Sequence, residues 1–364
     1  MELETKLTEF ALALIDQQKA RIAVPPQRSS TGFWFGGGNM VEDADGQLYL
    51  VGRYRNFGDS RTGLGAGERG LELAIFRSDD GGQSWQKQVS FSKLELNVGD
   101  RDVLSIEGSA LGITERGVEL FVSTEKAGID YPAEFQSFLK PGTGVWTIDR
   151  LQAPTIDELK NAVIETVLES TDPSVLHVKD PSVYTAPDGD LVLLYCTHPY
   201  CWSSSNTAYA TRADRSDTLS ESHLDFFPRG FAWDIAITRG TSILDVPRIG
   251  AFAHQQVSLL FYDGGEALRN LDEHDRAVKR PRGYSCEEIG GVAYFLGGDM
   301  SRVFRLSRHK PLFISPYGTG CSRYVDVLAT SDGLYATWQQ SQNDLSQPLV
   351  MNFLTKNDVG RLLV

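Results

Sequence analysis

A repeat of roughly 72 residues is the feature that most restricts how this chain can fold. Each copy consists of a first segment, a tight turn and a strongly apolar strand. The turn glycines Gly46, Gly117 and Gly189 follow one another at intervals of 71 and 72 residues. Gln255 occupies the turn of the fourth copy, and Gly333 that of the fifth. A fixed period built from hairpins is typical of radial repetition, because no copy can bury both of its faces alone.

Each hairpin is followed by a polar loop, a third apolar run and a less regular fourth run. The third runs cover residues 71–76, 145–148, 207–211, 292–296 and 349–354. Four strands per copy make one propeller blade. The sequence therefore predicts an all-β fold, a five-bladed β-propeller over residues 27–364, with six blades as the alternative. Residues 153–169 have a helical pattern and predict an insertion in blade 2.

Residues 2–22 predict one amphipathic helix before the propeller. Its apolar stripe, with spacings of three and four positions, consists of Leu3, Leu7, Phe10 and Leu14. The pair Pro25-Pro26 ends the helix, so residues 1–26 are assigned to a short N-terminal helix and a linker. We expect the stripe to pack on the propeller, and the alternative is a homodimer contact.

The chain has a formal net charge of −13. This charge argues against nucleic acid or an anionic membrane as a partner, although a small anionic ligand senses only the local field. The N-terminus has no basic segment, and its apolar run at 10–15 is too short for a signal sequence or a membrane span. We therefore expect a cytoplasmic protein. The alternative is a secreted protein whose signal sequence has been removed.

Four cysteines are too few for a disulfide scaffold. We expect scattered reduced thiols, and a bond between Cys196 and Cys201 is the alternative. No Cys/His spacing resembles a zinc site, so neither a metal nor a cofactor is expected. A calcium ion on the propeller axis is a further alternative that no run of ligands indicates.

The segment Ser78-Asp79-Asp80-Gly81-Gly82-Gln83-Ser84-Trp85 fits the pattern S-x-D-x-G-x-x-W, known as the Asp-box. The Asp80 carboxylate can accept backbone N–H groups in a tight turn, and Gly82 supplies a conformation that other residues resist. Trp85 covers the turn with apolar surface. The segment resembles the boxes of sialidase-type BNR-repeat propellers. This resemblance implies a structural role on the face opposite the ligand pocket, and no catalytic role for Asp80 or Trp85.

A second resemblance concerns the first segments of the repeats. Lys179-Asp180-Pro181-Ser182-Val183, followed by a turn at Asp188-Gly189, resembles the DP segment of the five-bladed glycosidases of families 43 and 32. In those enzymes, carboxylates at the start of the innermost strands converge on the axis, so the resemblance implies axial carboxylates here. The chain departs from the pattern in blade 1, where Gly36-Gly37-Gly38 occupies the place of a carboxylate.

Alignment of the five copies on their turns indicates which residues face the axis. In chain order these are Asn39, Glu107, Asp180, Asp245 with Arg248 nearby, and Arg323. Glycoside hydrolysis needs a protonated acid on one side of the bond and a carboxylate on the other. Crowding raises the pKa of one carboxylate and keeps it protonated. We predict Glu107 as the general acid, Asp245 as the base and Asp180 as the orienting residue. The alternative for each is an ion pair with a neighbouring arginine.

Further substrate contacts are predicted on loops at the same end of the propeller. Arginines can bind a sugar carboxylate bidentately, as three arginines do in sialidases, and the candidates here are Arg55, Arg61, Arg248 and Arg323. The segment around Tyr284 resembles the one that holds a sialidase's nucleophilic tyrosine. In blade 3, His198 can donate to hydroxyls and Trp202 can stack on a sugar ring. Solvated ion pairs and loop packing are the alternatives.

The sequence therefore predicts a glycoside hydrolase that is exo-acting on an oligosaccharide, with a sialic or uronic acid as the candidate sugar. The first alternative is a non-catalytic carbohydrate-binding propeller, which predicts a pocket whose carboxylates all pair with arginines. The second alternative is a polysaccharide lyase. A lyase needs a His or Tyr base, such as His198, near an arginine-neutralised carboxylate.

Overall fold

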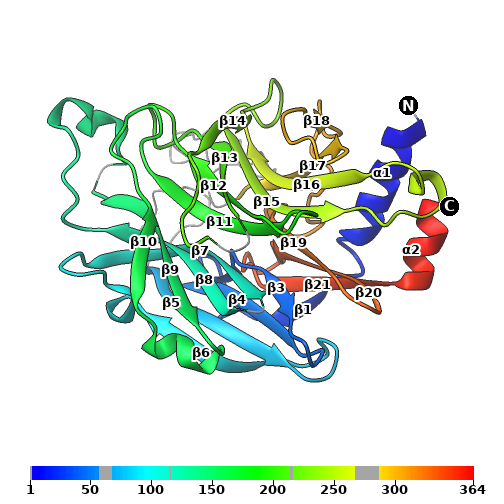
Figure 1. Cartoon of the computed structure of the whole chain (residues 1–364), viewed down its shortest axis with the longest axis horizontal. Helices are drawn as coiled ribbons and strands as arrows, with labels where there is room; N and C mark the ends of the chain where they lie inside the picture. Colours follow the sequence, from blue (N-terminus) through cyan, green and yellow to red (C-terminus); the bar gives the residue numbers. More distant parts are fainter. Residues whose placement is uncertain (1, 57–67, 115, 141, 214–215, 267–286) are drawn as a thin grey trace.

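Five antiparallel sheets surround a central axis and form the body of the molecule (Figure 1). This architecture comes from a computed structural model, which describes residues 2–56, 68–114, 116–140, 142–213, 216–266 and 287–364. Each sheet is one blade, and its strands follow one another from the axis outward. The prediction of an all-β, five-bladed propeller is confirmed, and the alternative with six blades is wrong.

The blades follow the chain in order. Blade 1 contains β2 (Trp34–Gly36), β3 (Met40–Glu42), β4 (Leu48–Asn56), β5 (Glu68–Ser78) and β6 (Gln86–Ser92). Blade 2 contains β7 (Val103–Thr114), β8 (Gly117–Lys126), β9 (Val145–Ala153) and β10 (Ile164–Leu168). Blade 3 contains β11 (Val178–Thr185), β12 (Leu191–Thr197), β13 (Asn206–Arg212) and β14 (His223–Phe227).

Blade 4 contains β15 (Ile237–Asp245), β16 (Val257–Gly265), β17 (Ile289–Leu296) and β18 (Phe304–Arg305). Blade 5 contains β19 (Ser322–Ala329), β20 (Gly333–Gln340), β21 (Leu349–Thr355) and β1 (Arg21–Val24). Short 3-10 turns lie between strands: η1 (Leu94–Leu96), η2 (Ala133–Phe138), η3 (Asp157–Asn161) and η4 (Gly250–Phe252). The second strands β12, β16 and β20 are buried along their whole length, because neighbouring blades cover both of their faces. This explains the strongly apolar runs of the repeat.

The ring is closed by pairing the two ends of the chain in one blade. β1 is antiparallel to β21, with Arg21 opposite Met351 and Ile22 opposite Val350. The outermost strand of blade 5 therefore comes from residues 21–24. The sequence had assigned these residues to the N-terminal helix and linker at 1–26, outside the propeller. The insertion predicted at 153–169 forms the turn η3 and the outer strand β10, where a helical pattern suggested a longer helix.

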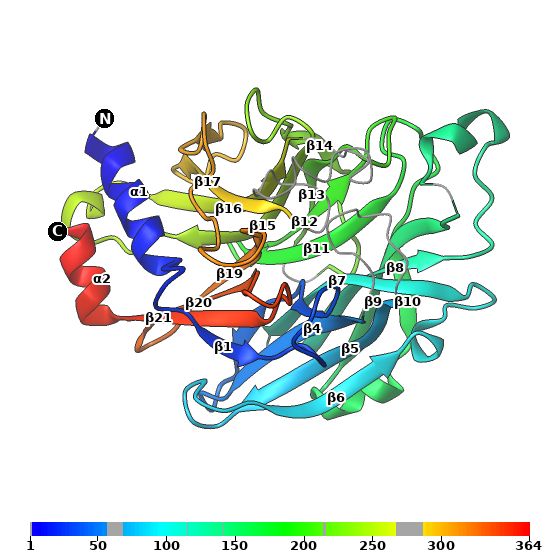
Figure 2. The ribbon, with the colours of Figure 1, turned by 180° about the vertical axis from the view of Figure 1, so that it is seen from behind.

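The predicted N-terminal helix is present but shorter than expected, since α1 spans Glu2–Leu14. Its apolar stripe packs on blades 4 and 5 and on α2 (Lys356–Leu363), and Leu7, Phe10 and Leu14 are fully buried. Figures 1 and 2 show α1 and α2 side by side at the rim of the propeller. The contact that suggested a homodimer is thus made within the chain.

The Asp-box segment forms the turn between β5 and β6. Asp80 accepts the backbone N–H of Ser84 at 2.9 Å, and the Ser78 hydroxyl accepts that of Gly82 at 2.9 Å. Gly82 has a φ of 78°, in the left-handed region that favours glycine. The turn lies at the end of blade 1 away from Arg53 and Arg55, because Leu48 pairs with Ser78. The sialidase resemblance itself stays a prediction.

Two further findings concern the described part of the chain. None of its helices has the length and apolar character needed to cross a membrane. Cys196 and Cys201 are unpaired, so the alternative of a disulfide between them is wrong.

Candidate functional site

A pocket open to solvent lies at one end of the propeller axis, and the space in it and at its mouth amounts to about 910 Å³. All five blades contribute to its wall. The side chains that define its chemistry are Trp34, Arg53, Arg55 and Arg69 of blade 1, Glu107, Lys140 and Trp146 of blade 2, His177, Lys179, Asp180, His198 and Trp202 of blade 3, Arg239 and Glu288 of blade 4, and Arg323 and Tyr324 of blade 5.

Register shifts in the inner strands turn side chains toward this pocket. β11 loses its pairing with β12 between Lys179 and Ser182, and β19 loses its pairing with β20 between Arg323 and Asp326. Asp180 and Tyr324 lie at the first position of these two bulges, with φ values of 54° and 53°. Such a conformation is unusual for residues other than glycine, and bulges re-aim side chains at functional sites.

Among the described residues, each carboxylate that lines the pocket pairs with an arginine. Glu107 accepts from Arg53 at 3.2 Å. Asp180 accepts from Arg239 at 3.1 Å, and also from the backbone N–H of Gly108 at 3.0 Å. Glu288 accepts from Arg323 at 2.6 Å. This is the pattern that the alternative of a non-catalytic binding propeller predicts.

The arginines keep these carboxylates ionised. Burial alone would raise the pKa of Glu107, but the charges of Arg53 and Lys179 outweigh burial and lower it to about 2. Burial is likewise outweighed at Asp180, whose pKa is lowered by Lys179 and Arg239. The pKa of Glu288 is also lowered despite burial. The expectation that crowding keeps Glu107 protonated is therefore wrong for the pocket as the protein forms it, because the cations that line it outnumber its carboxylates.

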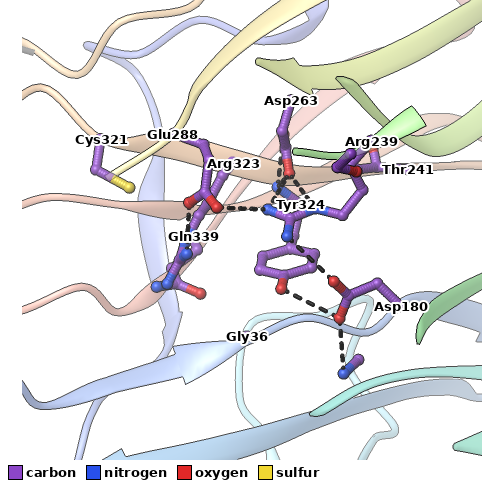
Figure 3. Close-up of polar contacts among 12 residues, drawn as sticks. Gly36, Asp180, Arg239, Thr241, Asp263, Glu288, Cys321, Arg323, Tyr324 and Gln339 are labelled. Atoms are coloured by element: carbon purple, nitrogen blue, oxygen red, sulfur yellow. Dashed lines mark hydrogen bonds and ion pairs between the residues drawn. The ribbon is translucent and has the colours of Figure 1, made fainter. Parts of the chain in front are cut away.

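Tyr324 lies at the centre of the network (Figure 3). Its hydroxyl accepts from Arg53 at 3.1 Å and donates to Asp180 at 3.3 Å. The Arg239 guanidinium lies 3.9 Å from the ring centroid, and the Tyr324 backbone N–H donates to Asp263 at 2.9 Å. Burial raises the pKa of the hydroxyl to about 12, so Tyr324 is a neutral hydrogen-bond donor.

The glycine run of blade 1 makes room for one of these arginines. A Cβ at Gly37 would lie 1.7 Å from Nη1 of Arg53, which comes from the second strand β4. Arg53 also donates to the carbonyl of Gly36 at 3.1 Å. Blade 1 therefore presents a guanidinium at the axis where the family 43 pattern has a carboxylate.

The pocket is strongly cationic in a chain of net charge −13. Among the described residues, three carboxylates line it, against seven cationic side chains: Arg53, Arg55, Arg69, Lys140, Lys179, Arg239 and Arg323. A small anion inside the pocket senses this local excess rather than the charge of the whole chain.

Blades 2 and 3 form an aromatic wall. The His177 ring lies 4.5 Å from Trp146 and 4.6 Å from His198, measured between centroids. Lys140 lies over Trp202 at 5.5 Å. Burial lowers the pKa of His198 to about 3 and that of His177 well below its ordinary value. A neutral histidine with so low a pKa is a weak base, which disfavours the lyase alternative.

The structure brings six of the predicted site residues together in the pocket: Glu107, Asp180, Arg55, His198, Trp202 and Arg323. Asn39 does not line it. Its side-chain amide bonds both backbone groups of Leu111 in blade 2, at 2.9 and 2.7 Å, and so joins two blades. Arg61 and Tyr284 lie outside the described residues. The catalytic and binding roles assigned to the six residues stay predictions.

The expected positions of Asp245 and Arg248 are wrong. Asp245 is exposed at the far end of β15, where it accepts from Tyr184 at 3.0 Å and from Ser258. Arg248 is exposed beyond it and donates to Gln256 at 3.1 Å. The error arises because the β15–β16 connection contains η4 and is longer than the other turns, which shifts the alignment on Gln255. The charged residue of β15 that lines the pocket is Arg239.

Several pocket residues were missed, although some had a signal in the sequence. Lys179 and Tyr324 adjoin the predicted Asp180 and Arg323. Arg53 lies two positions before Arg55 and therefore on the same face of β4. The remaining residues, Trp146, His177, Arg239 and Glu288, had no recognisable motif. In the described part of the chain, no three His, Cys, Asp or Glu side chains are grouped as metal ligands would be.

No protein-family model matches this sequence, and no curated protein matches it significantly. Solved structures match over nearly the whole chain. The protein BT0996, solved as an RGII complex, is 14% identical with a TM-score of 0.63, covering 97% of this sequence and 94% of its own. An α-L-arabinofuranosidase from Lactobacillus brevis is 10% identical with a TM-score of 0.56, covering 94% of both proteins.

The GH43_1 enzyme from Xanthomonas citri, solved with xylose, is 12% identical with a TM-score of 0.55, covering 96% of this sequence and 93% of its own. Some of the structures similar to this protein, such as the last two, thus carry the names of glycoside hydrolases. At such low identity the likeness shows a shared fold, and a fold can host many chemistries.

Proposed function

We propose that this protein is a glycoside hydrolase that releases an anionic sugar, a sialic or uronic acid, from the end of an oligosaccharide. One observation carries the proposal. Three carboxylates and a larger number of cations, contributed by all five blades, converge on one solvent-open pocket. Carboxylates supply the chemistry of glycoside hydrolysis, and the cations supply recognition of an anion. The similarity in fold to named glycoside hydrolases supports the same proposal.

The pocket suggests revised roles for its carboxylates. Asp180 is occupied by the backbone of Gly108, by Tyr324 and by Arg239, which suits an orienting residue. Glu107 and Glu288 remain for the reaction, with Glu288 in the role first given to Asp245. Glu107 protonates the glycosidic oxygen, so that the leaving sugar departs as an alcohol. Glu288 acts opposite it, either as the nucleophile or as the base that takes a proton from the attacking water.

Binding of an anionic substrate would raise the pKa of the general acid Glu107. The low pKa of Glu107 arises from the charges of Arg53 and Lys179. An anion bound in the same pocket offsets part of this positive charge, and the pKa of Glu107 then rises toward the range that a general acid needs. A neutral sugar gives no such offset. The proposal therefore expects selectivity for acidic sugars in turnover as well as in binding.

The test is a panel of aryl glycosides that includes a glucuronide, a galacturonide and a sialoside beside their neutral counterparts. We expect release of the aryl alcohol from an acidic glycoside, and a loss of at least ~100-fold in kcat for Glu107→Gln, Asp180→Asn and Glu288→Gln. Asp245→Asn is the matched control, since Asp245 is exposed and outside the pocket, and should keep full activity. Cleavage of no glycoside, or full activity in all three pocket variants, would overturn the proposal.

A non-catalytic carbohydrate-binding propeller is the second candidate. The observation that favours it is the pairing of Glu107, Asp180 and Glu288 with arginines of the pocket wall. Isothermal titration with the same sugars separates the two functions, because a binding protein gives heat of binding with no product after long incubation.

A further inference from the structure

Arg55 differs from the other arginines of the pocket. It lies on β4, and its side chain is 3% exposed yet lines the pocket. Its Nε and Nη1 atoms are buried and have no hydrogen-bond partner in the described part of the chain. A buried guanidinium without a counterion is costly, because burial removes the water that would otherwise solvate its charge.

The other pocket arginines have carboxylate partners within the protein. These pairs are Arg53 with Glu107, Arg69 with Glu125, Arg239 with Asp180, and Arg323 with Glu288. Their charges are already offset, and they hold the carboxylates in place. Of the described arginines that line the pocket, Arg55 is the one for which no carboxylate partner is found.

The backbone and one aromatic ring hold Arg55 in position. Trp34 of β2 lies directly opposite Arg55 of β4 in the sheet. The guanidinium carbon of Arg55 lies 5.8 Å from the Trp34 ring centroid, within the range of a cation–π contact. A guanidinium fixed in this way offers a planar fork that matches a carboxylate.

We propose that Arg55 is the specificity-determining contact for the anionic group of the substrate. In the complex, this anionic group is the counterion of the Arg55 guanidinium. This inference rests on the proposed function and deepens it, because it assigns recognition of the acid to one residue. Arg53, Arg239 and Arg323 form ion pairs with carboxylates of the protein instead. The acidic group of the sugar then faces blade 1, and its hydroxyls and the next sugar face the aromatic wall of blades 2 and 3.

The experiment measures selectivity rather than activity alone. Binding of glucuronate against glucose, and of galacturonate against galactose, is compared by titration calorimetry in the wild type, Arg55→Gln and Arg55→Lys. Sialic acid is tested beside them. We expect the preference for the acidic sugar to fall by roughly 10- to 100-fold in Arg55→Gln, the size of a charge-assisted contact, and Arg55→Lys to recover part of it.

Arg77→Gln is the matched control. Arg77 lies on β5 of the same blade, pairs with Asp79 on the surface and is remote from the pocket, so its replacement should leave the preference unchanged. Thermal unfolding confirms that each variant is folded. Equal binding of acidic and neutral sugars by the wild type, no binding of any acidic sugar, or an undiminished preference in Arg55→Gln would overturn the inference.

The two proposals fail in different ways. If the wild type binds an acidic sugar through Arg55 but cleaves no glycoside, the hydrolase is wrong and the role of Arg55 stands. If it cleaves glycosides and Arg55→Gln keeps its preference for the acidic sugar, the hydrolase stands and the role of Arg55 is wrong.

Discussion

Gly37 shows how a missing side chain determines what a propeller blade presents at its axis. Because Gly37 has no Cβ, the Arg53 guanidinium passes through the inner layer of blade 1 and reaches Glu107 and Tyr324. The axial position of this blade thus becomes cationic although its inner strands β2 and β3 contain no lysine or arginine. The charge of Arg53 at this position also lowers the pKa of Glu107 and keeps this carboxyl group ionised.

Gly37→Ala is expected to disable the pocket. Its Cβ would collide with Arg53, and its φ of 74° adds backbone strain of about 1–3 kcal/mol. We expect a lower free energy of unfolding in urea and a loss of sugar binding. Gly99→Ala is the control, because Gly99 has a φ of 60° but no atom within 4 Å of a built Cβ. Equal effects of the two changes on binding would contradict the collision.

Residue positions were predictable where the hairpin turn is tight. The turns at Gly117 and Gly189 lead back correctly to Glu107 and Asp180 on the inner strands. The fourth blade failed because η4 lengthens its hairpin, so that counting back from Gln255 reaches Asp245 in place of Arg239. Glu288 was not predictable, since it lies just before β17, outside the hairpins whose turns set the alignment of the repeats.

Among the elements, the short strand β1 closes the ring of blades. It is only four residues long, yet it covers the edge of β21 and completes blade 5. Val24 is 1% exposed and packs beside Leu349 and Met351, whereas Ile22 is 52% exposed. These two positions are two residues apart, and a register shift between them gives them opposite surroundings.

Val24→Asp is expected to open the ring. It buries a charge without a counterion, so the free energy of unfolding should fall by at least ~3 kcal/mol. Ile22→Asp, on the exposed face, should change it by less than about 0.5 kcal/mol. Urea unfolding followed by tryptophan fluorescence measures both. A similar small effect for the two variants would show that β1 is not needed for closure.

The repeat predicted the strands that lie in hairpins, because consecutive strands share a turn whose residues are visible in the sequence. β1 was missed for the opposite reason. Its partner β21 lies at the other end of the chain, and the apolar periodicity of the preceding helix extended the prediction over Arg21 and Ile22. The bulges that aim Asp180 and Tyr324 also left no signal, since a left-handed residue other than glycine cannot be read from a sequence.

At the scale of the whole molecule, α1 packs across blades 4 and 5 and holds these two blades together. Phe10 is fully buried among residues of blades 4 and 5, and Asn352 of β21 donates to the carbonyl of Leu14 at 2.9 Å. The hydrophobic stripe that suggested an intermolecular contact is therefore buried within the same chain. The overall architecture and the packing of the helix on the propeller were therefore predictable from the sequence, whereas the pair of blades that the helix bridges was not.

Phe10→Ala is expected to lower the free energy of unfolding by about 3–5 kcal/mol, because it leaves a cavity in a closed core. Leu12→Ala, at a position that is 43% exposed, should cost less than about 1 kcal/mol. Light scattering after size exclusion should give the same oligomeric state for both variants and the wild type. Dissociation of an oligomer by Phe10→Ala alone would instead show that α1 holds two copies together.

The pairing of β1 with β21 also fixes an order of events during protein synthesis. Arg21–Val24 leaves the ribosome before any blade does, but its partner strand is translated only after four blades have been completed. The growing polypeptide must therefore keep a strand edge and an apolar helix face unpaired while those blades are made. Such exposed edges are where nascent proteins aggregate or recruit chaperones. Closure of the ring therefore cannot precede the synthesis of the third strand of blade 5.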